Sequence, residues 1–186
     1  MRKKSLKRPS ASTYIQPAEG EINMTVYQEV FNRYYPFVCR QLTYLLGNRA
    51  EAEDITQETF IKLYHAPPPD YQNIGGWLAR VATNLAYNHM RTEKSRKRRE
   101  EKVNDKFISD TPEESAIKSE ETDYINKALA SLDERSRLCL IMKHSGFSYE
   151  EIASATGLKK SSVGTIIARA QSKFKKIYMQ MKGSDA

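Results

Sequence analysis

The sequence predicts an all-α protein made of two small helical domains that are joined by a flexible linker. Apolar residues recur at helical spacing through residues 23–99 and again through residues 120–182. Residues 100–119 between these segments carry no apolar stripe, which is typical of a linker. No strand pattern survives, because the one short apolar run, 138–142, lies between a predicted helix cap and Gly146.

The first domain, at residues 23–99, is predicted to begin with two helices. A basic segment at residues 1–22 precedes it and is expected to be a disordered tail. The first helix begins at Val26 and ends at Gly47, a glycine that can cap a helix in the left-handed conformation. The second covers residues 50–65, and the three prolines after it stop it, because a proline ring removes a backbone donor and clashes with the preceding turn.

The third helix is expected to follow a loop that contains Tyr71 and the pair Gly75-Gly76. Its inner face starts at Trp77, whose phase favours core packing over contact with a nucleic-acid base, and includes His89. The polar residues predicted for the outer side of this helix are Arg80, Asn84, Tyr87, Asn88 and Arg91.

The second domain is predicted to contain four helices and a helix-turn-helix. The helices are expected at residues 120–132, 134–145, 148–156 and 161–181. Ser148 and Glu151 match a capping box, and Phe147 and Ile152 are spaced as a hydrophobic staple at the start of the third of these helices. Gly157 can adopt the left-handed turn that a second helix crossing at a steep angle requires.

The last of these helices is amphipathic, and its outer face suits the major groove of DNA. Val163 and Ile166 lie on its inner face. Short polar side chains with an arginine and a lysine occupy its outer face, at Ser161, Thr165, Arg169, Ser172 and Lys176. A plain helical hairpin with a solvated basic face would have the same amphipathic pattern, but the turn, the caps and the charge together favour DNA binding.

The net charge of +7 is concentrated in basic blocks with an acidic segment between them. Residues 65–106, which include the basic run 94–99, carry nine basic and five acidic groups, and residues 134–186 carry ten basic and four acidic groups. Residues 107–133 carry two basic and seven acidic groups. A polyanion contacted at two places would explain this distribution, because Lys and Arg neutralise phosphates. On charge alone, a patchy solvated surface explains it equally well.

The sequence contains no recognisable catalytic constellation. His65, His89 and His144 are scattered, with no paired metal-ligand spacing and no glycine-rich phosphate loop. Cys39 and Cys139 each lie in an apolar helical pattern and are predicted to be reduced thiols rather than a disulfide. We therefore expect no catalytic residue, no metal, no cofactor and no small-molecule substrate. With neither a membrane span nor a secretory signal in the pattern, we expect a cytoplasmic protein.

Three segments resemble the conserved regions of bacterial sigma factors. Residues 50–64 (AEAEDITQETFIKLY) resemble region 2.2, and residues 77–91 (WLARVATNLAYNHMR) resemble regions 2.3 and 2.4. The helix-turn-helix resembles region 4.2. Two such domains with a short linker, and with neither region 1.1 nor a region 3 domain, are similar to the extracytoplasmic-function (ECF, group IV) sigma factors of the sigma-70 family. The resemblance covers residues from about 26 to 178.

The resemblance implies a transcription initiation factor that directs core RNA polymerase to −10 and −35 promoter elements, assists strand opening and is controlled by an anti-sigma factor, soluble or membrane-bound. It also implies that the second helix docks on the clamp helices of the largest polymerase subunit, and that the second domain contacts the polymerase flap. The docking residues would be Asp54, Gln57, Glu58 and Ile61. The plainer alternative is a solvated acidic face with one exposed isoleucine, which is normal for single residues.

The resemblance assigns the third helix and the loop before it to the −10 element, where bases leave the stack and are held by aromatic and amide groups. The residues for this role are Tyr71, Asn84, Tyr87, Asn88 and Arg91. Those for the −35 element are Lys159, Lys160, Ser161, Thr165, Arg169, Ser172 and Lys176. The chain departs from the family at the short loop with Gly75-Gly76, and at Gly164 and Ile166, where the family often has Lys and Arg. Base contacts at −35 should therefore come mainly from Thr165, Arg169 and the lysine pair.

Two other classes of protein are compatible with parts of this pattern. A two-domain repressor would bind duplex DNA on its own through the helix-turn-helix, and its first domain would sense a signal or dimerise. A helical adaptor would bind protein partners and show no dependence on DNA.

Overall fold

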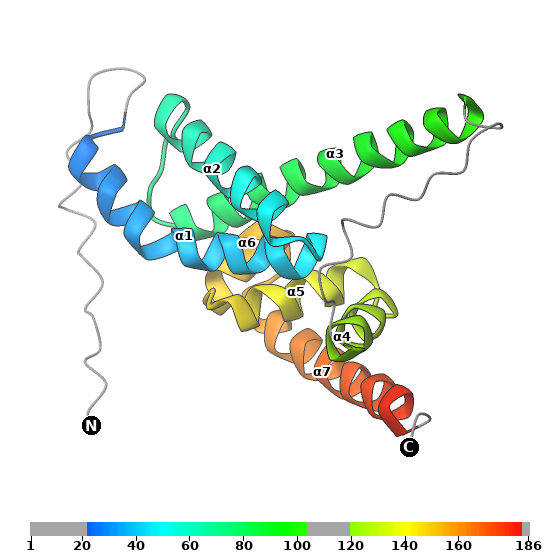
Figure 1. The fold of residues 1–186 in the computed structure, drawn as a ribbon. Helices are drawn as coiled ribbons and strands as arrows, with labels where there is room; N and C mark the ends of the chain where they lie inside the picture. The colour runs from blue at the N-terminus through cyan, green and yellow to red at the C-terminus, as the bar shows by residue number, and fades with distance from the viewer. Residues whose placement is uncertain (1–21, 104–119, 184–186) are drawn as a thin grey trace.

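The computed structural model describes residues 22–103 and 120–183, and within these ranges the chain forms helices and no strand (Figure 1). In chain order the helices are α1 (Met24–Leu46), α2 (Arg49–His65), α3 (Ile74–Val103), α4 (Glu120–Ala130), α5 (Glu134–Ser145), α6 (Tyr149–Thr156) and α7 (Lys160–Gly183). The predicted all-helical class is confirmed. The predicted N-terminal tail, apart from Ile22, and the predicted linker, apart from its first four residues, lie outside the described residues.

The helices begin and end at residues whose chemistry favours those positions. Asn48 precedes α2, and its side-chain oxygen accepts hydrogen bonds from the first-turn N–H groups of that helix at 2.9 and 3.4 Å. Such a cap satisfies donors that have no partner inside the helix. Gly47, Gly146 and Gly157 follow α1, α5 and α6 in the left-handed conformation, with φ of 72°, 113° and 70°. The predicted roles of Gly47 and Gly157 are confirmed.

The helices α1, α2 and α3 enclose the core of the first domain. Its fully buried apolar residues include Val38, Leu42, Phe60, Leu63 and Leu78. Burying a side chain of this size contributes about 1.5–3 kcal/mol to folding. This burial explains why the apolar positions of the sequence fix the inward side of each helix.

A buried glutamine joins two helices of this core. Gln41 of α1 is fully buried, and its Nε2 donates to Thr83 Oγ1 of α3 at 2.8 Å and to the Ala79 carbonyl at 3.3 Å. Thr83 Oγ1 in turn donates to the same carbonyl at 2.7 Å. Because a buried donor without a partner is costly, these bonds fix the register of α1 against α3.

The second domain consists of α4 to α7, and α6 with α7 forms the helix-turn-helix. The first of these two helices starts with the predicted capping box. Ser148 Oγ accepts from the Glu151 N–H at 3.3 Å, while Glu151 Oε2 accepts from the Ser148 N–H at 2.6 Å. Phe147 and Ile152, the predicted staple, are both buried. Val163 of α7 is also fully buried, which holds the second helix against the first.

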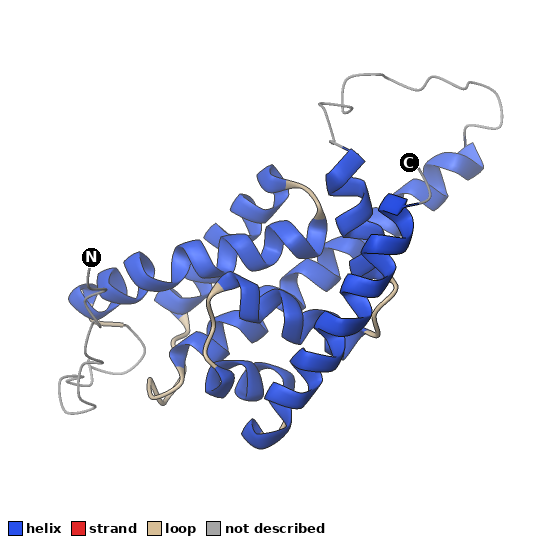
Figure 2. Ribbon diagram, turned by 90° about the horizontal axis from the view of Figure 1, so that it is seen from below, coloured by secondary structure: helices blue, strands red, loops and turns tan. Residues whose placement is uncertain are grey.

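The two domains pack directly against each other. Helices α5 and α6 lie along α1 and α3 (Figure 1). The view from below shows the helices packed into one body with short loops between them (Figure 2). The apolar core is continuous across both domains. The C-terminal part of α3 projects from this body (Figure 1).

The predicted glycine loop before the third helix is wrong. Gly75 and Gly76 lie in the first turn of α3, which starts at Ile74 and continues through the basic run 94–99 to Val103. Asn73 Oδ1 accepts from the Gly76 N–H at 3.3 Å, as a helix cap does. Paired glycines favour a loop because they have high backbone entropy, but tertiary contacts override that preference here.

Loss of the Ser148 cap should destabilise the folded chain. Ser148→Ala removes the acceptor for the Glu151 N–H, so we expect the free energy of unfolding to fall by roughly 0.5–2 kcal/mol. Chemical denaturation followed by circular dichroism measures this change. Ser161→Ala, at an exposed position of α7, is the control and should change stability by less than about 0.5 kcal/mol. Equal stability of the two variants would contradict the capping role.

Candidate functional site

The turn between α6 and α7 fixes how the second helix of the helix-turn-helix is presented. Gly157 supplies the left-handed residue, and the Leu158 N–H donates to the Ala153 carbonyl at 3.0 Å. Tyr149 of α6 lies beside Gly164 of α7, where a Cβ would be 3.4 Å from the ring. The outer side of α7 is therefore presented by a turn with one defined geometry.

All seven residues predicted for −35 contacts are exposed on α7 or the turn before it. They are Lys159, Lys160, Ser161, Thr165, Arg169, Ser172 and Lys176. Lys160 forms an exposed ion pair with Glu150 of α6, with Nζ 3.1 Å from Oε2. Exposed pairs of this kind are weak, so a phosphate group can displace the carboxylate. The geometry and charge of this face suit a duplex major groove.

The outer face of α2 is also exposed. Asp54, Gln57, Glu58 and Ile61 all lie there, and Ile61 is 55% exposed although its neighbour Phe60 is fully buried. An exposed isoleucine surrounded by polar and acidic groups is a small apolar point on a negative surface. Such a face can dock on a partner that offers basic groups around an apolar pocket.

The five residues predicted for −10 contacts do not form one exposed face. Asn84, Asn88 and Arg91 are exposed on α3, whereas Tyr71 and Tyr87 are half-buried. Trp77 is half-buried against the core, as its phase predicts.

Tyr87 is on the predicted side of α3, but α5 covers it. Its hydroxyl is buried beside Glu134 and Arg137, with no hydrogen bond of normal geometry among the described residues. Burial raises the pKa of the Tyr87 phenol above its ordinary value of 10.0, and the nearby Glu134 carboxylate raises it further, while Arg137 opposes the shift. The sequence could not reveal this, because the covering residues are more than 40 positions away in the chain.

Asn84 and Tyr87 share a groove with the second domain. Its lining comes from α3, from the start of α5 and from the end of α6: Thr83, Asn84, Tyr87, Asp133, Glu134, Arg135, Leu138, Ala155 and Thr156. Two of the predicted −10 residues therefore face α5 and α6 in this structure.

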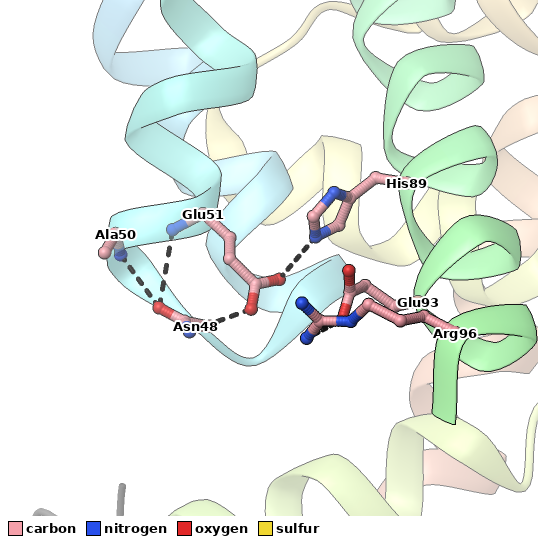
Figure 3. Close-up of polar contacts among 6 residues, drawn as sticks. All are labelled: Asn48, Ala50, Glu51, His89, Glu93 and Arg96. Atoms are coloured by element: carbon pink, nitrogen blue, oxygen red, sulfur yellow. Dashed lines mark hydrogen bonds and ion pairs between the residues drawn. The ribbon is translucent and has the colours of Figure 1, made fainter. Parts of the chain in front are cut away.

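A contact between a histidine and a carboxylate holds the start of α2 against the middle of α3. His89 Nε2 lies 3.1 Å from Glu51 Oε2, and both side chains are partly exposed (Figure 3). Glu51 Oε1 also accepts from the Asn48 side chain at 3.0 Å (Figure 3). Beyond this point α3 carries the exposed basic run 94–99, where Arg96 pairs with Glu93 at 2.9 Å. The predicted inward position of His89 is thus only partly correct, because its ring meets a carboxylate at the edge of the core.

Within residues 22–103 and 120–183, no group of three or more His, Cys, Asp or Glu side chains is arranged to hold a metal ion. Among the same residues, no helix combines the length and apolar character needed to cross a membrane.

Two family models match this chain, one for each domain. The model of sigma-70 region 2 matches residues 30–96, and that of sigma-70 region 4 matches residues 122–173. The first match contains α2 and the part of α3 that carries the predicted −10 residues. The second contains the helix-turn-helix.

Several curated relatives match most of this chain. The ECF RNA polymerase sigma factor BldN of Streptomyces coelicolor is 29% identical over 149 residues, which are 76% of this chain and 56% of the relative. SigE of Mycolicibacterium smegmatis is 29% identical over 170 residues, 88% of this chain and 65% of the relative. The RNA polymerase sigma-H factor of Pseudomonas aeruginosa is 30% identical over 137 residues, 64% of this chain and 67% of the relative. The chain thus spans less than two thirds of the length of BldN and SigE.

Two solved structures share the fold. The sigma factor RpoE, solved in complex with the anti-sigma factor NepR from Bartonella quintana, superposes with a TM-score of 0.58 at 21% identity, covering 83% of this chain and 97% of that chain. CnrH, solved in complex with the cytosolic domain of CnrY, gives 0.55 at 17% identity, covering 88% and 92%.

The burial of Tyr87 predicts how stability depends on alkaline pH. As the pH rises past the ordinary value of 10.0, the unfolded chain ionises this phenol before the folded chain does, so the folded state loses stability relative to the unfolded state. Tyr87→Phe cannot ionise and should escape this loss. The difference in free energy of unfolding between wild type and variant should therefore stay constant below about pH 9 and shift in favour of the variant above it.

Denaturant titrations at each pH measure this difference. Tyr44→Phe, which removes an exposed phenol of α1, is the control for the loss of a tyrosine hydroxyl. A Tyr87→Phe difference that does not change with pH would contradict a raised pKa for the Tyr87 phenol.

Proposed function

Because this chain belongs to the sigma-70 family of RNA polymerase sigma factors, and within it to the extracytoplasmic-function group, we propose that it binds core RNA polymerase and directs it to promoters through −10 and −35 elements. This proposal depends on the presence of two features in one chain. One is the exposed helix-turn-helix face, which has seven polar or basic residues on α7 and its turn. The other is a domain that matches region 2 of the sigma-70 family. It acts as a specificity factor and catalyses no reaction itself.

The second domain reads the −35 element as duplex DNA. Thr165 and Arg169 lie one turn apart on the exposed side of α7 and are the residues for base edges in the major groove. Lys159 and Lys160 at the start of α7, and Lys176 two turns beyond Arg169, are positioned for phosphates.

The first domain takes the −10 element as a separated strand. Asn84, Asn88 and Arg91 supply amide and guanidinium groups on one side of α3, and Tyr71 and Tyr87 supply rings on which bases can stack. The exposed basic run 94–99 extends this side of α3 and is suited to phosphates.

The acidic face of α2 docks on the polymerase. Asp54, Gln57, Glu58 and Ile61 contact the clamp helices of the largest subunit, and the second domain contacts the flap. An anti-sigma factor controls the chain, since one structural neighbour, the sigma factor RpoE, was solved in complex with the anti-sigma factor NepR. The chain works in the cytoplasm with the polymerase and has no small-molecule substrate.

Transcription in vitro with purified core polymerase over a promoter library tests this function. The wild-type chain should produce specific transcripts that core polymerase alone does not produce. Asp54→Ala with Glu58→Ala should abolish these transcripts and co-purification with core, because it removes two exposed charges from the docking face. The melting temperature should barely change, since surface substitutions usually cost under about 0.5 kcal/mol.

The matched control removes two exposed or half-exposed carboxylates elsewhere, with Glu29→Ala on α1 and Glu93→Ala on α3. It should still co-purify with core polymerase. If the docking variant binds core as well as the control does, the docking face is wrongly assigned. If free wild-type chain binds an operator-like duplex specifically at about 10⁻⁸ M without polymerase, the repressor alternative is favoured. If adding the chain does not change transcription, the alternative that it is a helical adaptor is favoured.

The two DNA elements should respond to different substitutions. Arg169→Ala should weaken promoter binding by about 1–3 kcal/mol and relax preference only at −35 positions. Lys176→Ala should weaken all promoters alike and reduce the salt slope by about one unit. Asn84→Ala should slow strand opening at −10, as permanganate footprinting reports, and leave the −35 preference intact. If a randomised-promoter selection shows that Arg169→Ala changes the sequence preference at −10, the assignment of the two domains to separate elements is contradicted.

A further inference from the structure

Exposed basic side chains continue from the helix-turn-helix across the end of α5 onto α1. Together they are called the basic strip here, and its members are Lys159, Lys160, Lys143, Arg40 and Arg33. The two lysines at the start of α7 belong to the face proposed for the −35 element. The lysine of α5 and the arginines of α1 have no part in the proposed function, although all of them are exposed.

The two arginines lie on the side of α1 that borders the second domain. They are two turns apart and therefore share one side of the helix, with Phe37 between them. The ring of Phe37 lies 5.8 Å from that of Phe147, which directly precedes the cap of α6. Another side of α1 carries Tyr35, whose ring lies 5.9 Å from that of Phe60 in α2. The arginines thus lie beside the corner between α5 and α6, away from the contact with α2.

Contacts hold both arginines in place without neutralising them. Arg40 Nη1 donates to the main-chain carbonyl of Ser145, the last residue of α5, at 3.4 Å. A guanidinium has five N–H donors, so most of them stay available. The guanidinium carbon of Arg33 lies over the ring of Tyr34, 5.1 Å from its centroid. Glu29, one turn before Arg33, is the exposed acidic residue at which the strip ends on α1.

Lys143 connects the arginines of α1 to the helix-turn-helix. It lies in the last turn of α5, and its Nζ is 4.9 Å from the ring centroid of Tyr149 in α6. Tyr149 is 40% exposed and lies beside Gly164 of α7, where a Cβ would be 3.4 Å from the ring. The strip therefore continues from α1 over the ends of α5 and α6 to the start of α7.

The carboxylates closest to the strip are already engaged. Glu150 pairs with Lys160 at 3.1 Å. Glu151 accepts from the Tyr34 hydroxyl with one oxygen and from the Ser148 N–H with the other. Within residues 22–103 and 120–183, the arginines of α1 form no ion pair with a carboxylate. The strip is thus a positively charged surface to which both domains contribute.

We propose that the basic strip holds the phosphate backbone of duplex DNA, independently of sequence, in the free chain. The duplex that lies on α7 continues over Lys143 and onto the arginines of α1. This inference rests on the proposed function, because it takes DNA as the partner of α7. It adds to that function a surface of the first domain that contacts duplex DNA away from both promoter elements.

The spacing and the chemistry of the strip suit DNA. One strand of B-form DNA carries a phosphate for about every 3.4 Å of helix axis. The arginines of α1 are seven residues apart, or roughly 10 Å along the helix, so each can meet a different phosphate. A guanidinium also matches the geometry of phosphate oxygens better than an ammonium group does. An acidic polypeptide would satisfy the charge, but it would not explain why the strip joins the face of α7 that suits a major groove.

The first experiment measures binding of the full chain, without polymerase, to a fluorescein-labelled 25-base-pair duplex of arbitrary sequence. Fluorescence anisotropy at several salt concentrations gives the affinity and its salt slope. Arg33→Ala with Arg40→Ala should reduce the slope by about two units, because each lost phosphate contact removes about 0.9 of a unit. The affinity in about 0.1 M salt should fall by at least about tenfold.

Two further variants separate the loss of phosphate contacts from other effects. Arg33→Lys with Arg40→Lys keeps both charges and should retain most of the affinity and the slope. A similar loss in this variant and in the alanine variant would show that altered packing is responsible, which would overturn the inference. Lys62→Ala with Lys127→Ala, which removes exposed charges on α2 and α4, should stay close to wild type.

The second experiment locates the duplex on the chain. Cys39→Ser removes the partly exposed thiol, whereas Cys139 is buried and can stay. In this background Asn32→Cys, next to Arg33 on the exposed part of α1, carries a benzophenone label. Irradiation should cross-link this position to the duplex. The same label at Gln57→Cys, on the exposed face of α2, is the control and should give no cross-link.

Unchanged affinity and salt slope in the alanine variant would overturn the inference, and so would the absence of a cross-link from position 32. If the alanine variant instead loses affinity only for polyglutamate, the strip is a surface for acidic protein. These outcomes are separable from a failure of the proposed function. A chain that never supports promoter-specific transcription contradicts that function, whereas these measurements use no polymerase and no promoter.

Discussion

The approach of α6 to the first turn of α3 is the contact on which the arrangement of the two domains depends. It is possible only because Gly75 and Gly76 lack side chains where Glu151 and Ser154 pass. Glu151 stabilises both its own helix and the contact between domains. One of its carboxylate oxygens closes the capping box of α6, and the other accepts a hydrogen bond from the Tyr34 hydroxyl of α1. A change that weakened the start of α6 would therefore also loosen the contact between domains, and the reverse holds too.

The seam between the domains combines apolar packing with hydrogen bonds. It combines one buried aromatic cluster around Phe147 with hydrogen bonds to main-chain carbonyls, which cost little to exchange for water. The groove beside Tyr87 leaves a hydroxyl without a hydrogen bond of normal geometry. Such a cost is tolerated where packing is incomplete.

The proposed functional faces differ in kind as well as in exposure. The face of α7 is rigid, because the left-handed turn at Gly157 and the buried Val163 fix it against α6. The face of α2 is exposed, and the opposite side of the same helix is buried in the core. The face of α3 alone is shared between domains, and its availability is a property of the tertiary arrangement rather than of the helix.

The sequence by itself determined the helices, their inward sides and most of the caps, because these depend on spacing and on contacts a few residues apart. Ser148, Gly47 and Gly157 could be assigned for that reason, and the outer faces of α2 and α7 followed from the same periodicity. Only the tertiary structure decided that Gly75 and Gly76 lie in a helix, that His89 meets Glu51 and that Tyr87 is covered. Each of these depends on residues far away in the chain, and local pattern carries no information about which distant surface will press against a given side chain. The sequence shows that Gly75-Gly76 departs from the family pattern. The reason for the two glycines is the close approach of α6, which lies more than 70 positions later in the chain.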